Sequence, residues 1–371
     1  MSCLLTALFF VAKSQPGSVA APDEELVSNN LAAGRRTWQS SVYSFVGESV
    51  GLRNSISYRD IPGGRKLLVT NLIAIAENLK IVDLKDRKSV KRGLDAIRIN
   101  LNGRDAEKVP PPEEEMNEVL AGMQQLAERV EAEGEVPSPE NYDYQCPMER
   151  LVYTYRFANG KYVKHRHPDF PYVFFYDTWA LLLMISKQYD KARTVMEKGL
   201  VWDPFYTPML TMYINASQKL KDWEAYHRTA LDMLAVSYRR HDVGEAFIAL
   251  GGYYLQREQF KECYSCMRTS KAMDPEHWKL EKQLFQVREL CLEKAENISD
   301  KNVGPILESC DIHFPDIIKT AQAAAYVGEL SYNDGYFQQA MYYLKEAYHV
   351  TQDEHVKNLL DSMQGDPTKM N

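Results

Sequence analysis

The sequence predicts a mainly α-helical protein whose second half is an α-solenoid, an array of stacked helical hairpins. Between residues 176 and 277, helix-length apolar segments alternate with short turns that each carry one aromatic residue. These aromatics are Tyr189, Trp223 and Phe260, which lie 34 and 37 residues apart, and Phe337 follows 77 residues later. A period of this length is typical of repeated helical hairpins, which bury their apolar faces only by stacking on one another.

Composition and charge narrow the class of protein. At 371 residues, 45% hydrophobic and 26% charged, the chain has the composition of a folded protein. Its net charge of −7 and its pI near 5.7 supply no basic field, so a nucleic-acid partner is not expected. The charge is uneven, because residues 105–149 carry a balance of −11 and residues 80–104 a balance of +5. We expect these adjacent blocks to neutralise each other rather than to form two separate binding surfaces.

The N-terminus holds an apolar run over residues 3–12, which is too short to span a bilayer as a helix. Small residues follow, so the run is either the core of an export signal cleaved near Ala20 or part of a cytoplasmic protein. The cytoplasmic alternative is favoured, because no basic residue precedes the run and Lys13 follows it. Cleavage would also remove one of the 6 cysteines and leave an odd number, which suits an oxidising compartment poorly. No other segment of the sequence approaches the length of a membrane span.

Proline and glycine clusters divide the rest of the chain. After Pro62, the helical spacing of apolar residues predicts helices over residues 65–80 and 87–101. Three consecutive prolines at 110–112 mark the next boundary, and an acidic helix follows them. The chain is therefore expected to hold a leader or linker (1–37), an N-terminal helical region (38–109), an acidic helix with a linker (110–150), a β-hairpin (151–170), the repeat domain (171–355) and a C-terminal tail (356–371).

Residues 151–167 have a different pattern. β-Branched and aromatic residues flank Asn159-Gly160, a dipeptide that favours the tight turn of a β-hairpin. Pairing across this turn would place His165 and His167 on one face. Two histidines make an incomplete zinc site, because zinc takes three or four protein ligands. We therefore interpret them as polar residues at the edge of the hairpin and expect no bound metal.

The repeats resemble those of the tetratricopeptide-repeat family. The clearest unit has the family's leucine–glycine–tyrosine spacing at Leu250, Gly251 and Tyr254, with small residues where two helices would cross. It closes with Asp274-Pro275, and a proline in this place ends one helix and can begin the next. Between residues 281 and 315 the period is kept only if one hairpin is degenerate. The resemblance covers about half of the chain.

The resemblance implies a right-handed superhelix in which the first helix of each hairpin lines a concave groove that binds an extended peptide. The positions that correspond to the groove are mixed polar and acidic. They are Asp177, Met184, Thr211, Asn215, Gln218, Glu245, Ile248, Gln256, Glu329 and Asn333. Family members that clamp a C-terminal carboxylate use Lys, Asn and Arg on these helices. The first helices here offer Asn215 but almost no cations, which argues against such a clamp.

No motif of a catalytic or cofactor site accompanies the repeats. Cys263 and Cys266 have the spacing of a redox dithiol, but a reactive thiol usually lies at a helix N-terminus. Both fall inside the second helix of a repeat, which favours buried structural cysteines. The sequence also lacks the nucleophile-elbow, zinc-protease and dinucleotide-binding patterns. We therefore predict a protein that is not an enzyme and that carries no cofactor.

Three functions are left open by the sequence. The favoured hypothesis is an interaction or scaffold protein that binds a peptide segment of a protein partner in the groove. The first alternative is an exported or envelope-associated assembly factor whose working surface is residues 40–170. The second alternative is an enzyme with an unrecognised site in those same residues, where His165 and His167 are the only histidines. Partner identity and oligomeric state are open at this stage.

Overall fold

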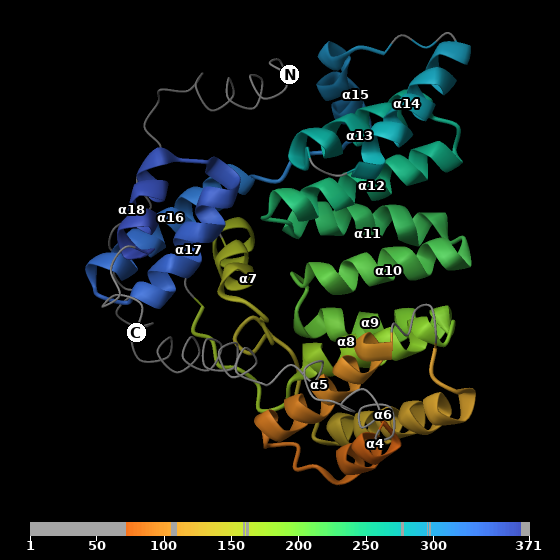
Figure 1. Cartoon of the computed structure of the whole chain (residues 1–371), viewed down its shortest axis with the longest axis vertical. Helices are drawn as coiled ribbons and strands as arrows, with labels where there is room; N and C mark the ends of the chain where they lie inside the picture. The colour runs from red at the N-terminus through yellow and green to blue at the C-terminus, as the bar shows by residue number, and fades with distance from the viewer. Residues whose placement is uncertain are drawn as a thin grey trace. The chain divides into compact units, whose positions relative to one another are not determined.

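The computed structural model describes residues 72–104, 110–158, 160, 163–275, 278–294, 296 and 298–364. Every regular element in these ranges is a helix (Figure 1), which confirms the prediction of a mainly α fold. Successive helices pack as hairpins in the manner of an α-solenoid, whereas the right hand of the superhelix stays a prediction. The expectations for the leader, the export signal, residues 38–71 and the tail beyond residue 364 lie outside the described residues.

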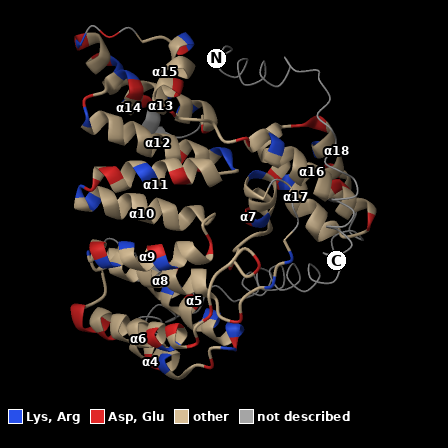
Figure 2. Ribbon diagram, turned by 180° about the vertical axis from the view of Figure 1, so that it is seen from behind, with Lys and Arg blue, Asp and Glu red and all other residues tan. Residues whose placement is uncertain are grey.

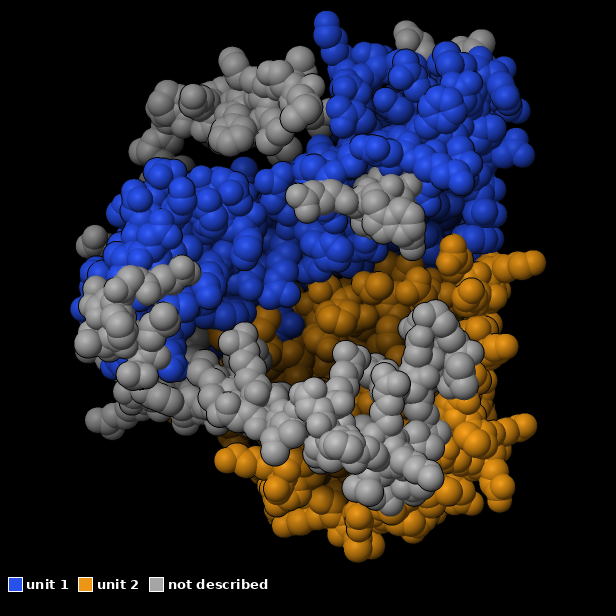
Figure 3. Space-filling model, in the orientation of Figure 1, with its two compact units in different colours: residues 1–33, 148–162, 222–371 blue, residues 34–147, 163–221 orange. Residues whose placement is uncertain are grey.

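The helices fall into two compact units, which Figure 3 shows in different colours. Of the described residues, unit 2 holds 72–147 and 163–221, and unit 1 holds 148–158, 160 and 222–364. The helices of unit 2 are α4 (Leu72–Ile81), α5 (Arg87–Arg104), α6 (Glu113–Ala132), α8 (Tyr172–Ile185), α9 (Tyr189–Trp202) and α10 (Thr207–Leu220). Those of unit 1 are α7 (Pro147–Val152), the π-helix η2 (Tyr153–Phe157), α11 (Trp223–Val236), α12 (Arg240–Gln256), α13 (Phe260–Met273), α14 (Trp278–Glu293), the 3₁₀-helix η3 (Asp300–Asn302), α15 (Val303–Ser309), α16 (Ile317–Asn333), α17 (Phe337–Thr351) and α18 (Glu354–Gln364).

The four aromatic residues that set the sequence period occupy equivalent places in the structure. Tyr189, Trp223, Phe260 and Phe337 are the first residues of α9, α11, α13 and α17. The residue two positions before each aromatic has a left-handed backbone: Lys187 (φ 58°), Lys221 (φ 58°), Glu258 (φ 55°) and Gly335 (φ 81°). A left-handed residue commonly ends a helix and turns the chain. The period in the sequence therefore marks a tight turn between two successive helices.

In unit 2, the three N-terminal helices share a core with the first repeat helices. α4 packs on α5 and α6, and both α5 and α6 contact α8. The approach of α4 to α5 depends on Gly93, where an added Cβ would lie 2.7 Å from Cδ2 of the buried Leu79. α6 buries one stripe that includes Met123 and Leu126, as its apolar spacing predicts. The acidic residues of its first turn, Glu113–Glu115, offset the positive end of the helix dipole.

Asp143 connects three parts of unit 2. Its carboxylate is fully buried and forms an ion pair with Arg87 of α5, in which Nη2 of Arg87 lies 2.5 Å from Oδ1 of Asp143. The same carboxylate accepts a 2.9 Å hydrogen bond from the backbone N–H of Val173, in the first turn of α8. The backbone N–H of Asp143 donates to the carbonyl of Trp202, the last residue of α9, at 2.9 Å. One residue of the linker thus joins the start of α5, the start of α8 and the end of α9.

In unit 1, α12 and α13 form one hairpin, α16 and α17 form another, and α18 covers α17. Arg239, just before α12, donates two hydrogen bonds of 3.0 and 2.8 Å to Glu346 on α17. The segment between the two hairpins is irregular. α14 and α15 each pack on α13, so within the described residues α15 does not complete a hairpin with α14 as α17 does with α16. Between residues 281 and 315, where a degenerate hairpin was expected, the described residues therefore form two α-helices that both pack on α13.

We expect Gly328→Ala to lower the free energy of unfolding by about 1–3 kcal/mol, because the α16–α17 crossing has no room for a side chain. A Cβ at Gly328 would lie 2.7 Å from Cγ and 3.2 Å from the backbone nitrogen of Leu344. Gly304→Ala in α15 is the matched control, since a Cβ there meets no atom within 4 Å. Alanine is the better helix former by about 1 kcal/mol. Urea unfolding followed by circular dichroism measures both variants, and equal stability of the two would contradict the packing argument.

The predicted β-hairpin is wrong. Residues 147–157 are helical instead, as α7 followed by the π-helix η2, and the described residues from 163 to 167 form no strand. The side chain of Thr154 donates to the carbonyl of Arg150 at 2.9 Å, a bond that belongs to a helix. Tertiary contacts override the local β preference here, since Arg156 of the π-helix reaches α11 and α16. Asn159, the first residue of the expected turn, lies outside the described residues.

The two histidines of that segment do lie together, as expected, but on an irregular stretch. The rings of His165 and His167 are 4.8 Å apart and nearly perpendicular. His165 is buried, and its Nε2 lies 2.6 Å from the carbonyl oxygen of Tyr142. A histidine nitrogen held by a backbone carbonyl positions the ring in the core. His165 therefore packs the linker of unit 2.

Candidate functional site

The predicted groove residues of α8 are placed unequally. Asp177 is 2% exposed, and its carboxylate forms an ion pair with Arg98 of α5. Burial raises the pKa of Asp177, and the neighbouring Arg98 guanidinium opposes this shift. Arg98 also lies over the ring of Phe174, 5.0 Å from its centroid. Asp177 is therefore a packing residue between α5 and α8, which corrects its assignment to a peptide groove. Met184, about two turns further along α8, is half-buried.

The three predicted residues on α10 share one face of that helix. Thr211, Asn215 and Gln218 are spaced by four and three residues, which places them in one row. Asn215 and Gln218 are exposed, while Thr211 is half-buried and its hydroxyl donates to the carbonyl of Thr207 at 3.1 Å. Lys219 is the single charged residue in α10, whose ribbon is mostly tan in Figure 2. This face of unit 2 therefore offers uncharged hydrogen-bonding groups. We call Thr211, Asn215 and Gln218 the amide face.

In unit 1, the predicted residues lie on two helices. On α12, Glu245 and Ile248 are half-buried and Gln256 is exposed. On α16, Asn333 is exposed, but Glu329 lies 3.3 Å from Nε2 of His355 on α18. The C-terminal helix therefore engages part of the α16 set. A groove lined by all of these residues stays a prediction.

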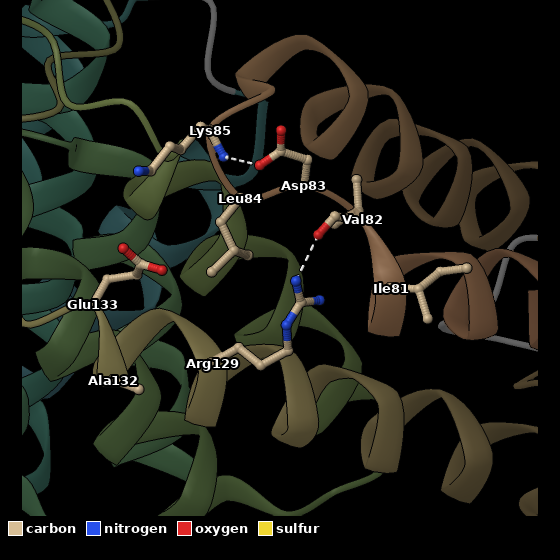
Figure 4. Close-up of a pocket in the computed structure, with 8 residues that line it drawn as sticks. All are labelled: Ile81, Val82, Asp83, Leu84, Lys85, Arg129, Ala132 and Glu133. Atoms are coloured by element: carbon tan, nitrogen blue, oxygen red, sulfur yellow. Dashed lines mark hydrogen bonds between the residues drawn. The ribbon is translucent and has the colours of Figure 1, made fainter.

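The pocket in Figure 4 is a hollow of about 400 Å³ in unit 2, where α4 ends and α6 ends. Arg129 points into it from α6, but its guanidinium donates to the backbone carbonyls of Lys80 at 2.5 Å and Val82 at 2.6 Å. These bonds satisfy carbonyls at the C-terminal end of α4. Asp83 accepts from the backbone N–H of Lys85 at 3.0 Å. The polar groups of Arg129 and Asp83 are thus occupied by hydrogen bonds to the backbone around the end of α4, and no lining residue is a nucleophile that is hydrogen-bonded to a base.

The cysteines of unit 1 gather around α13. Cys263, Cys266 and Cys291 are fully buried. Burial raises the pKa of Cys263 to about 12 and that of Cys291 to about 11, and it raises the pKa of Cys266 well above its usual value. These thiols are protonated at neutral pH, and the thiolate is the form that reacts or binds metal. Within the described ranges, no three His, Cys, Asp or Glu side chains lie close enough together to hold a metal ion.

Comparisons with known proteins leave the family open. No family model and no curated protein matches the chain. Among solved structures, a tetratricopeptide repeat protein from Parabacteroides merdae is 14% identical and is matched over 82% of this chain and 100% of its own, with a TM-score of 0.29. A likeness this low carries no argument. The class, a mainly α helical-repeat protein, therefore rests on the hairpins themselves.

The helices also bear on the membrane question. Among the described residues, no helix combines the length and the apolar composition that a membrane crossing requires.

Proposed function

We propose that the protein is a non-catalytic interaction protein that holds an extended segment of a partner against the first helices of its hairpins. The amide face on α10 supports this proposal most. Its exposed Asn215 and Gln218 offer both donors and acceptors in one row along the helix. Such groups can pair with the backbone of an extended peptide, whose N–H and C=O groups also come in both kinds.

The side chains of the candidate residues on α10 and α12 indicate which kind of peptide they would accept. On α12, the half-buried Ile248 lies between the polar Glu245 and Gln256, so an apolar contact is flanked by hydrogen-bonding groups. The candidate residues include carboxylates and amides and no cation. A segment that ends in a free carboxylate would therefore find no cationic partner, whereas an internal segment has no terminal carboxylate that needs one. We propose the latter class of ligand.

The buried thiols and the occupied pocket polar groups support a non-catalytic role. A nucleophile needs a lowered pKa or an adjacent base, and burial shifts the pKa of Cys263 and Cys266 in the opposite direction. The alternative function is that of an assembly factor that works through residues 40–170, and the domain division of the structure bears on it. The described part of that range up to residue 147 belongs to the same compact unit as α8–α10. A surface there would be presented together with the amide face.

Photocrosslinking tests the proposed face. A photoreactive phenylalanine analogue at position 218 is expected to capture a partner peptide in a lysate of the source cells, and mass spectrometry identifies the crosslinked segment. In the chain without the photoreactive residue, replacing Asn215 and Gln218 together with alanine is expected to lower recovery of that partner in a pull-down at least about fivefold, since each lost hydrogen bond is worth about 0.5–1.5 kcal/mol.

The matched control carries the same photoreactive residue at Gln338, an exposed position on α17, the second helix of its hairpin. The peptides crosslinked at position 338 are expected to differ from those crosslinked at position 218. Equal capture at both positions, or unchanged pull-down recovery by the double alanine variant with retained helicity, would remove the amide face as the binding site.

A further inference from the structure

The helix α14 exposes an apolar stripe that no other helix of the described residues covers. Phe285 is 65% exposed and Leu292 is 59% exposed. These residues are seven positions apart, so they lie on one side of the helix. The buried residues of α14, Val287 and Cys291, lie roughly 110–150° around the helix axis from that stripe, given about 100° per residue. α14 therefore packs on α13 through one side and presents apolar side chains on the other.

The irregular repeat explains why this stripe is open. The first helices α12 and α16 are each followed by a second helix that packs along them. After α14, the chain continues through η3 to the short helix α15, which packs on α13. Figure 1 shows α14 and α15 beside α13. Among the described residues, α14 thus lacks the partner helix that completes the other hairpins.

The charges of α14 fit a second copy of the same helix in the antiparallel direction. The helix carries three basic and three acidic residues in WKLEKQLFQVRELCLE and is neutral, although the whole chain has a net charge of −7. If Phe285 of one copy faces Leu292 of the other, Arg288 faces Glu289, and the two-fold axis repeats both pairs. Arg288 and Glu289 are both exposed. Opposite charges beside an apolar seam are the usual determinants of helix pairing and direction.

We propose that α14 is a homodimer interface in which two copies pair antiparallel through Phe285 and Leu292, with reciprocal Arg288–Glu289 ion pairs. A seam of one 16-residue helix is about 24 Å long and buries less than the roughly 1,200 Å² of a stable interface. The dimer is accordingly weak, with a dissociation constant of about 1–100 μM. This inference is independent of peptide binding at the amide face.

Sedimentation equilibrium of the full chain from about 1 to 200 μM tests the interface, a range set by the expected affinity. The wild type is expected to show a reversible monomer–dimer equilibrium, and Phe285→Glu/Leu292→Glu to stay monomeric throughout. Ile81→Glu/Val201→Glu is the control, because it adds the same charge at two other exposed apolar positions, 80% and 57% exposed, in unit 2. The control is expected to dimerise like the wild type.

Charge reversal tests the antiparallel register. Arg288→Glu and Glu289→Arg alone are each expected to weaken the dimer about three- to tenfold, whereas the double reversal restores it. A wild type that is monomeric at every concentration overturns the proposal. The same monomeric result is expected if another segment of the same chain covers the stripe. A dimer that survives the double glutamate variant overturns it as well.

Discussion

Asp143→Ala is expected to lower the free energy of unfolding of unit 2 by about 3–5 kcal/mol, because it removes one partner of a buried ion pair. Arg87 would keep its bonds of 3.1 and 2.8 Å to the carbonyls of Pro168 and Phe170 but lose its counter-charge. The backbone N–H of Val173 would lose its acceptor at the start of α8. Buried groups left without partners account for most of such a cost. Chemical denaturation followed by circular dichroism measures the change.

Two further variants separate the causes. Asp143→Asn keeps an oxygen for Val173 but not the charge, so its loss of stability is expected to be intermediate. Asp169→Ala removes an exposed ion pair, in which the side chain of Asp169 is 59% exposed and that of Arg166 is 81% exposed. This substitution is expected to cost less than about 1 kcal/mol of stability. If Asp143→Ala is no more destabilising than Asp169→Ala, the linker does not hold unit 2 together as described.

Arg156→Ala is expected to destabilise unit 1 by about 2–4 kcal/mol, because three bonds from a charged group are lost together. Nη1 donates to the carbonyls of Ala235 and Ser237, at 3.1 and 2.8 Å, and Nε donates to the hydroxyl of Thr320 at 3.0 Å. Burial lowers the pKa of Arg156 to about 10, so the side chain stays charged at neutral pH. A cation at the end of α11 also complements the negative end of that helix dipole.

Hydrogen exchange is the sharper measurement for Arg156. The amides of α7 and η2 are expected to exchange faster in Arg156→Ala, while those of α8 and α9 in unit 2 keep their protection. Arg156→Lys retains the charge without the planar fork of donors, so partial recovery is expected. Unchanged protection of η2 in the alanine variant would mean that other contacts hold the π-helix in place.

The regular repeats could be predicted from the sequence because their signal is local. One turn aromatic every 34 or 37 residues and a left-handed residue two positions before it are consequences of the same short hairpin turn. The apolar stripes of α5 and α6 were also readable, since a helix that buries one face repeats its apolar residues every three or four positions. These features are set by neighbours along the chain.

The failures arose where distant residues decide the structure. The β-branched and aromatic residues after position 150 favour a strand locally, yet Arg156 bonds to residues 79, 81 and 164 positions away. A π-helix of this kind has no pattern of its own in the sequence. Asp177 corresponds to a groove position in the family, but Arg98, 79 positions earlier, takes its carboxylate. No spacing rule connects these two residues, so only the folded chain reveals their pairing.

The same long separations have a consequence for synthesis on the ribosome. Of the described residues, the chain contributes 148–158 and 160 to unit 1, then returns to unit 2, and resumes unit 1 at Asp222. Arg156 reaches Thr320, which is synthesised 164 residues later. At about 5–20 residues per second, the π-helical segment emerges about 8–30 s before this last partner exists. Unit 1 is therefore closed late, because the π-helical segment is synthesised well before the residue that completes its contacts.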